Sequence, residues 1–286
     1  MTAALRPRYP KAFRPLAGVR VLSLALNLPG PAAAARLRAL GAEVRKIEPP
    51  GGDPMRELSP ALYRAMHRGV PLRSIDLKTA AGRQVLDDEL RQSDLLLTAF
   101  RPAALRRLGL SPNALAARHP HLSAVAIVGY PGSKSALAGH DLTFQAEAGL
   151  IDASRLPTTL LADMSGALLV VEAAMGALLQ ARASKQGAFL QVALSDAAAF
   201  VAVPRALGLT RTGAVLGGEL PEYGVYRCAD GYVAIAALEP HFAQALAEAA
   251  GGRTRGRIAR WCRAHRAAEL DAIARRDDLP LRSWTA

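Results

Sequence analysis

Apolar runs and helical patterns alternate along the first part of the chain. The run Val19–Ala25 is typical of a buried strand, and a turn-forming segment, Asn27–Gly30, follows it. An alanine-rich helix is then expected from Pro31 to Gly41, and Glu43–Glu48 (EVRKIE) predicts a second strand. A helical crossover between consecutive strands places them in parallel. The pattern therefore predicts the β-α-β start of an open α/β sheet with helices on its faces.

The same alternation continues as far as Arg205. The segment Gly166–Arg182 is almost wholly apolar and helix-forming, which indicates a buried helix. Short apolar runs predict further strands, and helix-forming segments lie between them. The other expected strands are Leu72–Lys78, Asp94–Phe100, Leu122–Tyr130 and Phe189–Leu194, and the other expected helices are Ala80–Arg91 and Pro102–Leu108.

A different pattern follows Arg205. The alternating runs Tyr223–Arg227 and Tyr232–Ala237 flank an Asp-Gly pair at Asp230, which is a strong signal for a hairpin. Helical segments are expected from Pro240 onward. We therefore expect two domains, a large α/β domain over residues 1–205 and a smaller α+β domain over residues 206–286.

The composition fits folded domains. Hydrophobic residues make up 51% of the 286 residues, enough for one large core or two smaller ones. No stretch approaches the roughly 20 uninterrupted apolar residues of a membrane-spanning helix, and residues 1–15 are basic without the apolar region of a signal peptide. Cys228 and Cys262 lack metal-ligand spacing, which argues against a disulfide framework or a zinc site. We expect a cytoplasmic protein without a metal.

The formal net charge of +12 predicts an anionic partner. Coenzyme A, nucleic acid and membrane phosphates would all satisfy this charge. The arginines beyond Gly251 are interspersed with acidic residues, which favours solvated helix faces over a nucleic-acid patch. We expect neither a nucleic-acid nor a membrane partner.

Several common motifs are absent. The first turn lacks the G-x-G-x-x-G that lets a backbone approach a pyrophosphate, which disfavours an NAD enzyme. The segment Gly129–Ser135 (GYPGSKS) has the wrong spacing for a P-loop. H-E-x-x-H, G-x-S-x-G and C-x-x-C are also missing, which removes the commonest hydrolase and redox readings.

Six phrases over residues 15–242 resemble, in the same order, the family III CoA-transferases. This family includes formyl-CoA and carnitine CoA-transferases and the α-methylacyl-CoA racemases. The phrases are PLAGVRVLSLALNLPGP, LGAEVRKIEPPGGDPMR, RSIDLKTAAGRQVL, SDLLLTAFRPAALRRLGL, AGHDLTFQAEAGLI and YGVYRCADGYVAIAALEPHF.

The resemblance implies a Rossmann-like large domain that holds CoA and a small domain late in the chain. It also implies a homodimer of interlocked subunits, and the short chain, which ends at Ala286, leaves open whether the interlocking is complete. The substrates would be an acyl-CoA and a carboxylic acid. Coenzyme A would enter as part of the substrate, without a permanently bound cofactor.

The candidate CoA ligands lie where strands end. The loop Pro49–Pro54 follows a parallel strand at the sheet edge where open α/β folds bind ligands. Arg101 follows the next such strand and could pair bidentately with a phosphate, although a surface arginine capping carbonyls is an equal alternative from the residues alone. Arg73 and Lys78 are weaker candidates. The full set of candidates is Arg101, Pro49, Gly51, Gly52, Arg73 and Lys78.

Asp163 is the main candidate for catalysis. It stands just before the predicted apolar helix, where helix amides would favour an ionised carboxylate and apolar walls would strip water from it. The resemblance implies that this aspartate attacks the thioester and forms an acyl-aspartyl anhydride. From sequence alone, a helix N-cap aspartate is the slightly favoured alternative.

His140 is the second catalytic candidate. Its resemblance to the racemases implies an acid/base pair in which His140 and Asp163 stand on opposite sides of the substrate α-carbon. Glu239 would support His140 from the small domain. The segment Phe144–Ala146 is more similar to the transferases, so both activities stay open.

The chain departs from the family pattern in two places. Thr98 and Ala99 replace an acidic residue and Asn before Phe-Arg-Pro, and the glycines that normally surround Asp163 are missing. A degenerate relative that binds CoA without turning it over is therefore a third hypothesis. We expect CoA transfer first and racemisation second.

Overall fold

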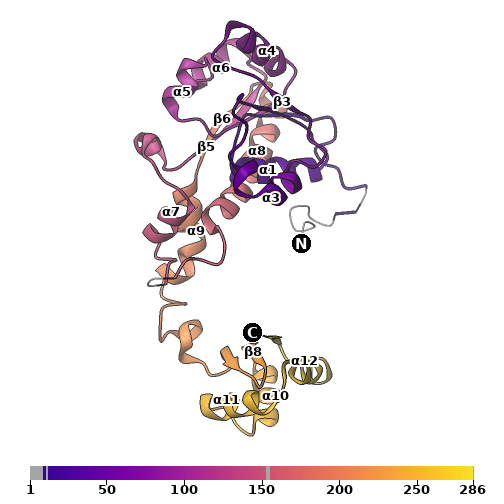
Figure 1. Ribbon diagram of the computed structural model, residues 1–286, viewed down its shortest axis with the longest axis vertical. Coiled ribbons are helices and arrows are strands. Elements are labelled where there is room, and N and C mark those ends of the chain that lie inside the picture. The colour runs from indigo at the N-terminus through magenta and orange to yellow at the C-terminus, as the bar shows by residue number, and fades with distance from the viewer. Residues whose placement is uncertain (1–8, 11, 153–154, 286) are drawn as a thin grey trace. The chain divides into compact units, whose positions relative to one another are not determined.

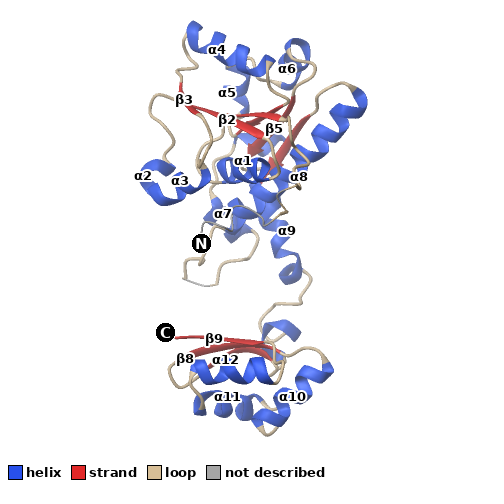
Figure 2. Ribbon diagram, turned by 90° about the vertical axis from the view of Figure 1, so that its right-hand side faces the viewer, coloured by secondary structure: helices blue, strands red, loops and turns tan. Residues whose placement is uncertain are grey.

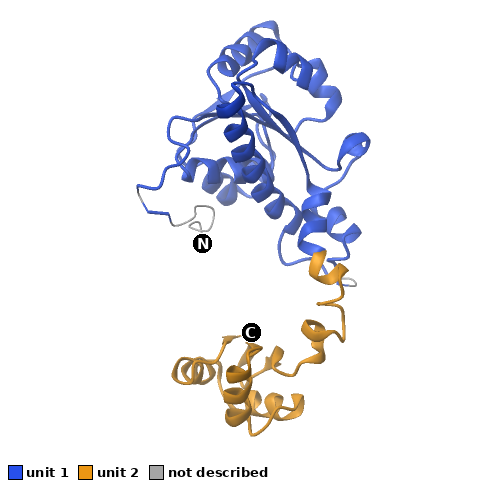
Figure 3. Ribbon diagram, turned by 180° about the vertical axis from the view of Figure 1, so that it is seen from behind, with its two compact units in different colours: residues 1–202 blue, residues 203–286 orange. Residues whose placement is uncertain are grey.

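The chain forms two compact units. The computed structural model describes residues 9–10, 12–152 and 155–285. One unit spans Met1–Ala202 and the other Val203–Ala286 (Figure 3), whereas the sequence places the division after Arg205. Residues 1–8, for which the sequence predicts no signal peptide, lie outside the described residues.

The first unit contains a six-stranded parallel sheet in the order β3-β2-β1-β4-β5-β6. This order confirms the predicted α/β fold with an open, Rossmann-like sheet. The strand order reverses between β1 and β4, and ligands of such folds bind at the carboxyl ends of the strands at this point. The strands are β1 (Arg20–Ser23), β2 (Glu43–Glu48), β3 (Leu72–Ser74), β4 (Leu95–Thr98), β5 (Ser123–Val128) and β6 (Phe189–Ala193).

Strand β3 is shorter than the predicted Leu72–Lys78. The chain leaves the sheet edge after Ser74, and the Asp76 carboxylate then accepts a hydrogen bond from the Lys78 backbone N–H. An aspartate that bonds the backbone two residues ahead makes a local turn. This turn ends the strand pattern early and leads into α4.

Helices cover both faces of the sheet (Figure 1, Figure 2). On β4, Leu95 and Leu97 belong to the core beneath α1 and α8, while Leu96 belongs to the core beneath α4, α5 and α6. Alternate residues of a strand point to opposite faces, so one apolar run serves two cores. The helices are α1 (Pro29–Ala39), α2 (Met55–Leu58), α3 (Pro60–Met66), α4 (Ala80–Arg91), α5 (Pro102–Arg107), α6 (Pro112–Arg118), α7 (Asp141–Glu147), α8 (Leu161–Ser184) and α9 (Leu194–Ala206).

Helix α8 begins earlier than the predicted Gly166. It starts at Leu161, and its N-cap residue is Leu160, so Asp163 lies inside the first turn and the N-cap reading of this aspartate is wrong. By length and composition α8 is apolar enough to cross a membrane. One side of it, including Val170 and Ala174, is buried in the core against α1 and the sheet.

The second unit packs three helices on a small antiparallel sheet. The predicted hairpin is present as β7 and β8, and Val233 and Ile235 of β8 are buried against Leu270. A third strand, β9, pairs with β8 and was not predicted, because its sequence, LRSWT, has no clear apolar alternation. The elements are β7 (Tyr223–Arg227), β8 (Gly231–Ala236), α10 (Pro240–Ala250), α11 (Arg255–Ala264), α12 (Ala267–Arg276) and β9 (Leu281–Thr285).

Candidate active site

A pocket of about 300 Å³ lies at the carboxyl ends of β1, β4 and β5. This is the side of the sheet, next to the reversal of strand order, where ligand binding is expected. The turn after β1 contributes Asn27, and the segment after β4 contributes Phe100 and Arg101. The loop before α7 contributes His140, and the first turn of α8 contributes Asp163. The lining of the pocket therefore brings together three of the site residues predicted from the sequence, Arg101, His140 and Asp163.

Asp163 is held in place through its backbone. Its N–H donates a hydrogen bond of 2.9 Å to Oδ1 of Asp141, which is buried at the start of α7. The other carboxylate oxygen of Asp141 accepts a hydrogen bond from Gln145, which also donates to the carbonyl of Thr159. Among the described residues, none hydrogen-bonds to the Asp163 carboxylate itself. The arrangement fixes the start of α8 and leaves a free carboxylate facing the pocket.

The electrostatic environment of Asp163 favours its protonated form. Burial raises the pKa of the Asp163 carboxyl from 3.8 to about 7, and the nearby Asp141 carboxylate adds to the rise. Desolvation and a like charge both penalise the ionised carboxylate. Of the two influences expected from the sequence, the loss of water to apolar walls therefore outweighs the helix amides. At neutral pH both protonation states of Asp163 are populated, which suits a group that exchanges protons or acts as a basic nucleophile.

This raised pKa predicts a pH-dependent stability difference for Asp163→Asn. The folded protein holds the Asp163 proton more tightly than the unfolded chain does, and this tighter binding stabilises the fold. The stabilisation is fully present below about pH 4 and is lost as the pH rises through 7. The neutral variant should be more stable than the parent at pH 8, with a gap that narrows toward pH 4. Urea unfolding of both proteins at several pH values measures the gap. A gap that stays constant with pH would contradict the shift.

His140 is exposed at the pocket and caps α7. Its backbone N–H donates to Oγ1 of Thr143, and its carbonyl accepts from the Thr143 hydroxyl. These bonds fix the backbone of His140 at the wall of the pocket. His140 and Asp163 therefore line one cavity from different elements, as the acid/base hypothesis requires.

A second pocket of about 360 Å³ adjoins the first through a shared wall residue, Phe100. Apolar side chains from β2, from α5 and from Leu24, just after β1, line it. Three cations, Lys78, Arg83 and Arg107, also line it. An apolar slot with cations around it suits a flat base that carries phosphates.

The other predicted CoA ligands have mixed positions. Pro49 and Lys78 line the second pocket and Arg101 the first. The linings of these two pockets do not include Gly51 or Gly52.

Two more predicted site residues are not among the residues that line these pockets. The Arg73 guanidinium forms an ion pair of 3.0 Å with Glu89, and neither pocket lining includes Arg73. Glu239 belongs to the second unit, where it is the N-cap residue of α10. Its support for His140 therefore stays a prediction.

A family model described as CoA-transferase family III matches residues 16–283. The chain belongs to CoA-transferase family III. Its fold agrees, because the crystal structure of Rv3272 from Mycobacterium tuberculosis superimposes with a TM-score of 0.81 and 26% identity, over 94% of this chain and 82% of that one. Relatives within the family include both transferases and racemases.

Two relatives illustrate this range. The probable fatty acyl-CoA transferase Rv3272 is 35% identical over 148 residues, which are 48% of this chain and 38% of that protein. Human alpha-methylacyl-CoA racemase is 30% identical over 256 residues, which are 82% of this chain and 65% of the racemase. Each alignment covers less than two thirds of the relative.

Sequence reasoning gave no role to several residues around these pockets. Asp141 stands beside His140 in the phrase AGHDLTFQAEAGLI, but its bond to the Asp163 backbone could not be predicted, because it depends on how α7 meets α8. Arg83 and Arg107 lie on α4 and α5, where a helix-face arginine is ordinarily solvated. A signal was available for both, because Arg83 lies in the same family phrase as Lys78, and Arg107 lies in the same phrase as Arg101.

Proposed function

We propose that this protein moves CoA between carboxylic acids, with Asp163 as the nucleophile. The supporting observation is a carboxylate that faces the pocket with a raised pKa and without a hydrogen-bond partner among the described residues. A raised pKa marks a more basic oxygen, and positions of this kind cluster at functional sites. Family membership makes the thioester of an acyl-CoA the natural target.

The proposed first step is an acyl transfer to the enzyme. An oxygen of ionised Asp163 attacks the thioester carbonyl carbon, the carbon–sulfur bond breaks, and CoA leaves as the thiolate. The product is a mixed anhydride between the acyl group and Asp163. The CoA thiolate then attacks the Asp163 carbonyl carbon, which releases the first acid as its carboxylate and leaves CoA as a thioester on Asp163. The second acid takes up this CoA by the same two steps in reverse, which frees the Asp163 carboxylate. The reaction needs no permanently bound cofactor, since CoA is part of the substrate.

The two pockets suit the two ends of an acyl-CoA. The thioester would lie beside Asp163, and the nucleotide end would occupy the second pocket, with its phosphates near Lys78, Arg83 and Arg107. Phe100, which lines both pockets, would lie beside the arm that joins these ends. The Arg101 guanidinium could pair with a phosphate or polar group of the arm.

Removing a phosphate-facing cation should weaken CoA binding. For Arg107→Ala we expect the Kd for CoA to rise about 10-fold, because a charge-assisted hydrogen bond is worth ~1.5–3 kcal/mol. Calorimetric titration with CoA measures the change. Arg73→Ala is the matched control, since Arg73 pairs with Glu89 and lies outside both pocket linings. Equal effects of the two variants would contradict the assignment of the nucleotide end.

Racemisation of a 2-methylacyl-CoA is the second candidate. The observation that favours it is the presence of His140 and Asp163 in one pocket, with an Asp163 pKa of about 7. A group with a pKa near neutral is well suited to both take up and release a proton. In this mechanism Asp163 and His140 would exchange the α-proton and the thioester bond would stay intact.

One experiment separates these activities. The protein is incubated with a panel of acyl-CoAs and free acids in deuterated water, and substrate and protein are analysed by mass spectrometry. CoA exchange together with a hydroxylamine-sensitive adduct on Asp163 supports transfer and sinks racemisation. Deuterium at the α-carbon without CoA exchange sinks transfer. If neither appears while CoA still raises the unfolding temperature, the protein is a binder without turnover, and both activities are refuted.

We also propose that the protein is a homodimer. Large apolar side chains are exposed along α8 and α9, among them Leu168 at 50%, Leu179 at 63% and Phe200 at 67%. Met164, Leu168 and Leu179 are spaced so that they lie on one side of α8, opposite the side in the core. A continuous apolar helix face of this kind is typical of a subunit interface.

The dimer can be tested by charging this surface. The double variant Leu168→Glu with Phe200→Glu should sediment as a monomer in analytical ultracentrifugation, because burying two carboxylates opposes association. An exposed residue on the other side of the sheet, Arg91→Glu on α4, provides the control and should leave the dimer intact. A parent protein that sediments as a monomer at micromolar concentration would refute the proposal.

A further inference from the structure

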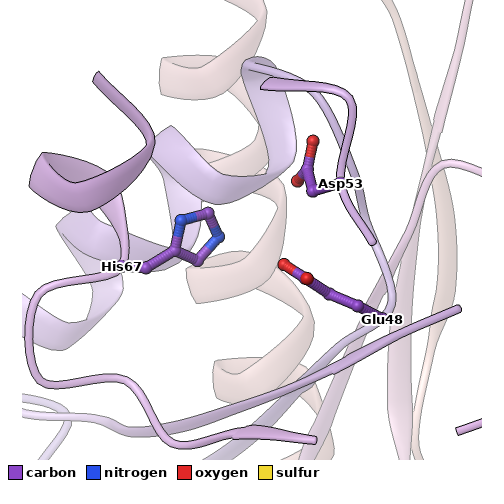
Figure 4. Close-up of side chains that lie close together, drawn as sticks. All are labelled: Glu48, Asp53 and His67. Atoms are coloured by element: carbon purple, nitrogen blue, oxygen red, sulfur yellow. The ribbon is translucent and has the colours of Figure 1, made fainter. Parts of the chain in front are cut away.

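A closed cluster of charged groups lies beneath the loop that follows β2. Its members are Lys46 and Glu48 on β2, Asp53 in the loop, and His67 after α3. All four side chains are buried. Figure 4 shows Glu48, Asp53 and His67 pointing toward one another, and their ligand atoms lie within 4.8 Å of one another, close enough to hold a metal ion.

The chain supplies its own cation to this cluster. The Lys46 ammonium lies 2.6 Å from Oδ2 of Asp53 and 3.1 Å from Oε1 of Glu48. Its third partner is Nε2 of His67, at 2.8 Å. The Lys46 ammonium therefore donates hydrogen bonds to Asp53 and His67 and forms an ion pair with Glu48.

His67 is suited to accept this bond. Its Nδ1 lies 2.8 Å from the backbone carbonyl of Tyr63, which requires a proton on Nδ1 and leaves Nε2 free to accept from Lys46. Burial, with the Lys46 charge second, lowers the pKa of His67 and keeps the ring neutral. The cluster is therefore fully bonded with one ammonium, two carboxylates and a neutral imidazole, and Arg56 supplies the second positive charge at Glu48.

One atom of this cluster reaches the candidate active site. Oδ1 of Asp53 accepts a hydrogen bond of 3.0 Å from the backbone N–H of Asn27 and another of 3.0 Å from that of Met55. Asn27 lines the pocket and has a φ of 65°, a left-handed conformation that asparagine adopts more readily than most residues other than glycine. The Asp53 carboxylate supplies the hydrogen bond that its backbone N–H makes in this conformation.

We propose that Asp53, oriented by Lys46, is a positioning residue that sets the substrate-facing wall at Asn27. The Lys46 bond occupies Oδ2, which leaves Oδ1 directed at the Asn27 turn. The wall that Asn27 forms lies in the same pocket as Asp163. The inference rests on the proposed function, in that the ligand positioned by this wall is the acyl-CoA thioester.

The test uses Asp53→Asn, which preserves the shape of the side chain. The amide oxygen of the variant turns to the Lys46 ammonium, since that bond is charge-assisted, and its NH2 group then faces the Asn27 N–H. The turn loses its acceptor while the cluster keeps its cation. We expect kcat/KM for acyl-CoA to fall about 10- to 100-fold, because small displacements of a binding wall have effects of this size.

Tyr63→Phe is the matched control. The Tyr63 hydroxyl bonds Glu48 and Arg56 in the same cluster and is not among the partners of Asn27. This variant should lose stability without a comparable fall in kcat/KM. If the role of Asp53 were merely structural, kcat/KM would fall in both variants in proportion to their loss of stability. That outcome would overturn the proposal.

A second measurement does not require turnover. Hydrogen exchange followed by mass spectrometry reports on a peptide containing Asn27, whose amide should exchange faster in Asp53→Asn and stay protected in Tyr63→Phe. Unchanged protection in Asp53→Asn would overturn the proposal. If the parent protein turns over no acyl-CoA, the proposed function fails, while the exchange data and the Kd for CoA in the two variants still decide whether Asp53 sets the wall.

Discussion

Asp163→Asn should lower kcat for CoA exchange by ~10³-fold or more, while the Kd for CoA changes little. The substitution preserves shape and removes the oxygen that attacks the thioester, so the loss should appear in the chemical step rather than in binding. Rates of CoA exchange between an acyl-CoA and a free acid, together with calorimetric titration of CoA, separate the two quantities.

Asp196→Asn is the control for this experiment. Asp196 also lies in the first turn of an apolar helix, α9, but it is exposed and is not part of the pocket lining. Its replacement should leave the exchange rate within a factor of two of the parent. Full activity in Asp163→Asn would refute the assignment of Asp163, and an equal loss in both variants would point to an effect on folding.

Lys46→Met should produce the largest loss of stability, with the free energy of unfolding lowered by about 3–5 kcal/mol. Lys46 is 2% exposed, and its removal leaves the Glu48 and Asp53 carboxylates facing each other without a cation between them. Methionine fills a similar volume, so lost charge rather than a cavity dominates the effect. Urea unfolding followed by circular dichroism measures the loss.

Arg91→Met is the contrasting case. Arg91 forms ion pairs with Asp87 and Asp88 on the surface of α4, where exposed pairs contribute about 0–1 kcal/mol. We expect a shift of the urea midpoint close to zero. A loss in Lys46→Met no larger than that in Arg91→Met would show that the buried cluster does not stabilise the fold.

Local patterns predicted the sheet well, because its strands are short apolar runs between turns. β4 and β5 lie inside the expected ranges Asp94–Phe100 and Leu122–Tyr130. The short helices α2 and α3 were not predicted, since two prolines and a serine in this segment obscure the helical pattern.

The same distinction holds for the candidate site: single residues could be predicted from local patterns, whereas contacts between distant residues could not. His140 could be named from a family phrase and Asp163 from the register that these phrases set, and the structure shows both residues in the lining of one pocket. The Lys46 cluster could not be predicted, because its contacts join residues up to 21 positions apart and every member has an ordinary surface role by residue type. The ion pair between Arg73 and Glu89 could not be predicted for the same reason, since Glu89 lies sixteen positions away on α4.

The pairing of Asp141 with Asp163 has a consequence for the energetics of acylation. Two carboxylates that share one end of α8 repel each other whenever both are ionised, and this repulsion contributes to the raised pKa of Asp163. Forming an anhydride on Asp163 would remove one of the two charges as completely as protonation does. The acylated enzyme would therefore lack a charge repulsion that the free, ionised enzyme has. Asp141 would thus favour the acylated intermediate over the ionised resting state without touching the substrate.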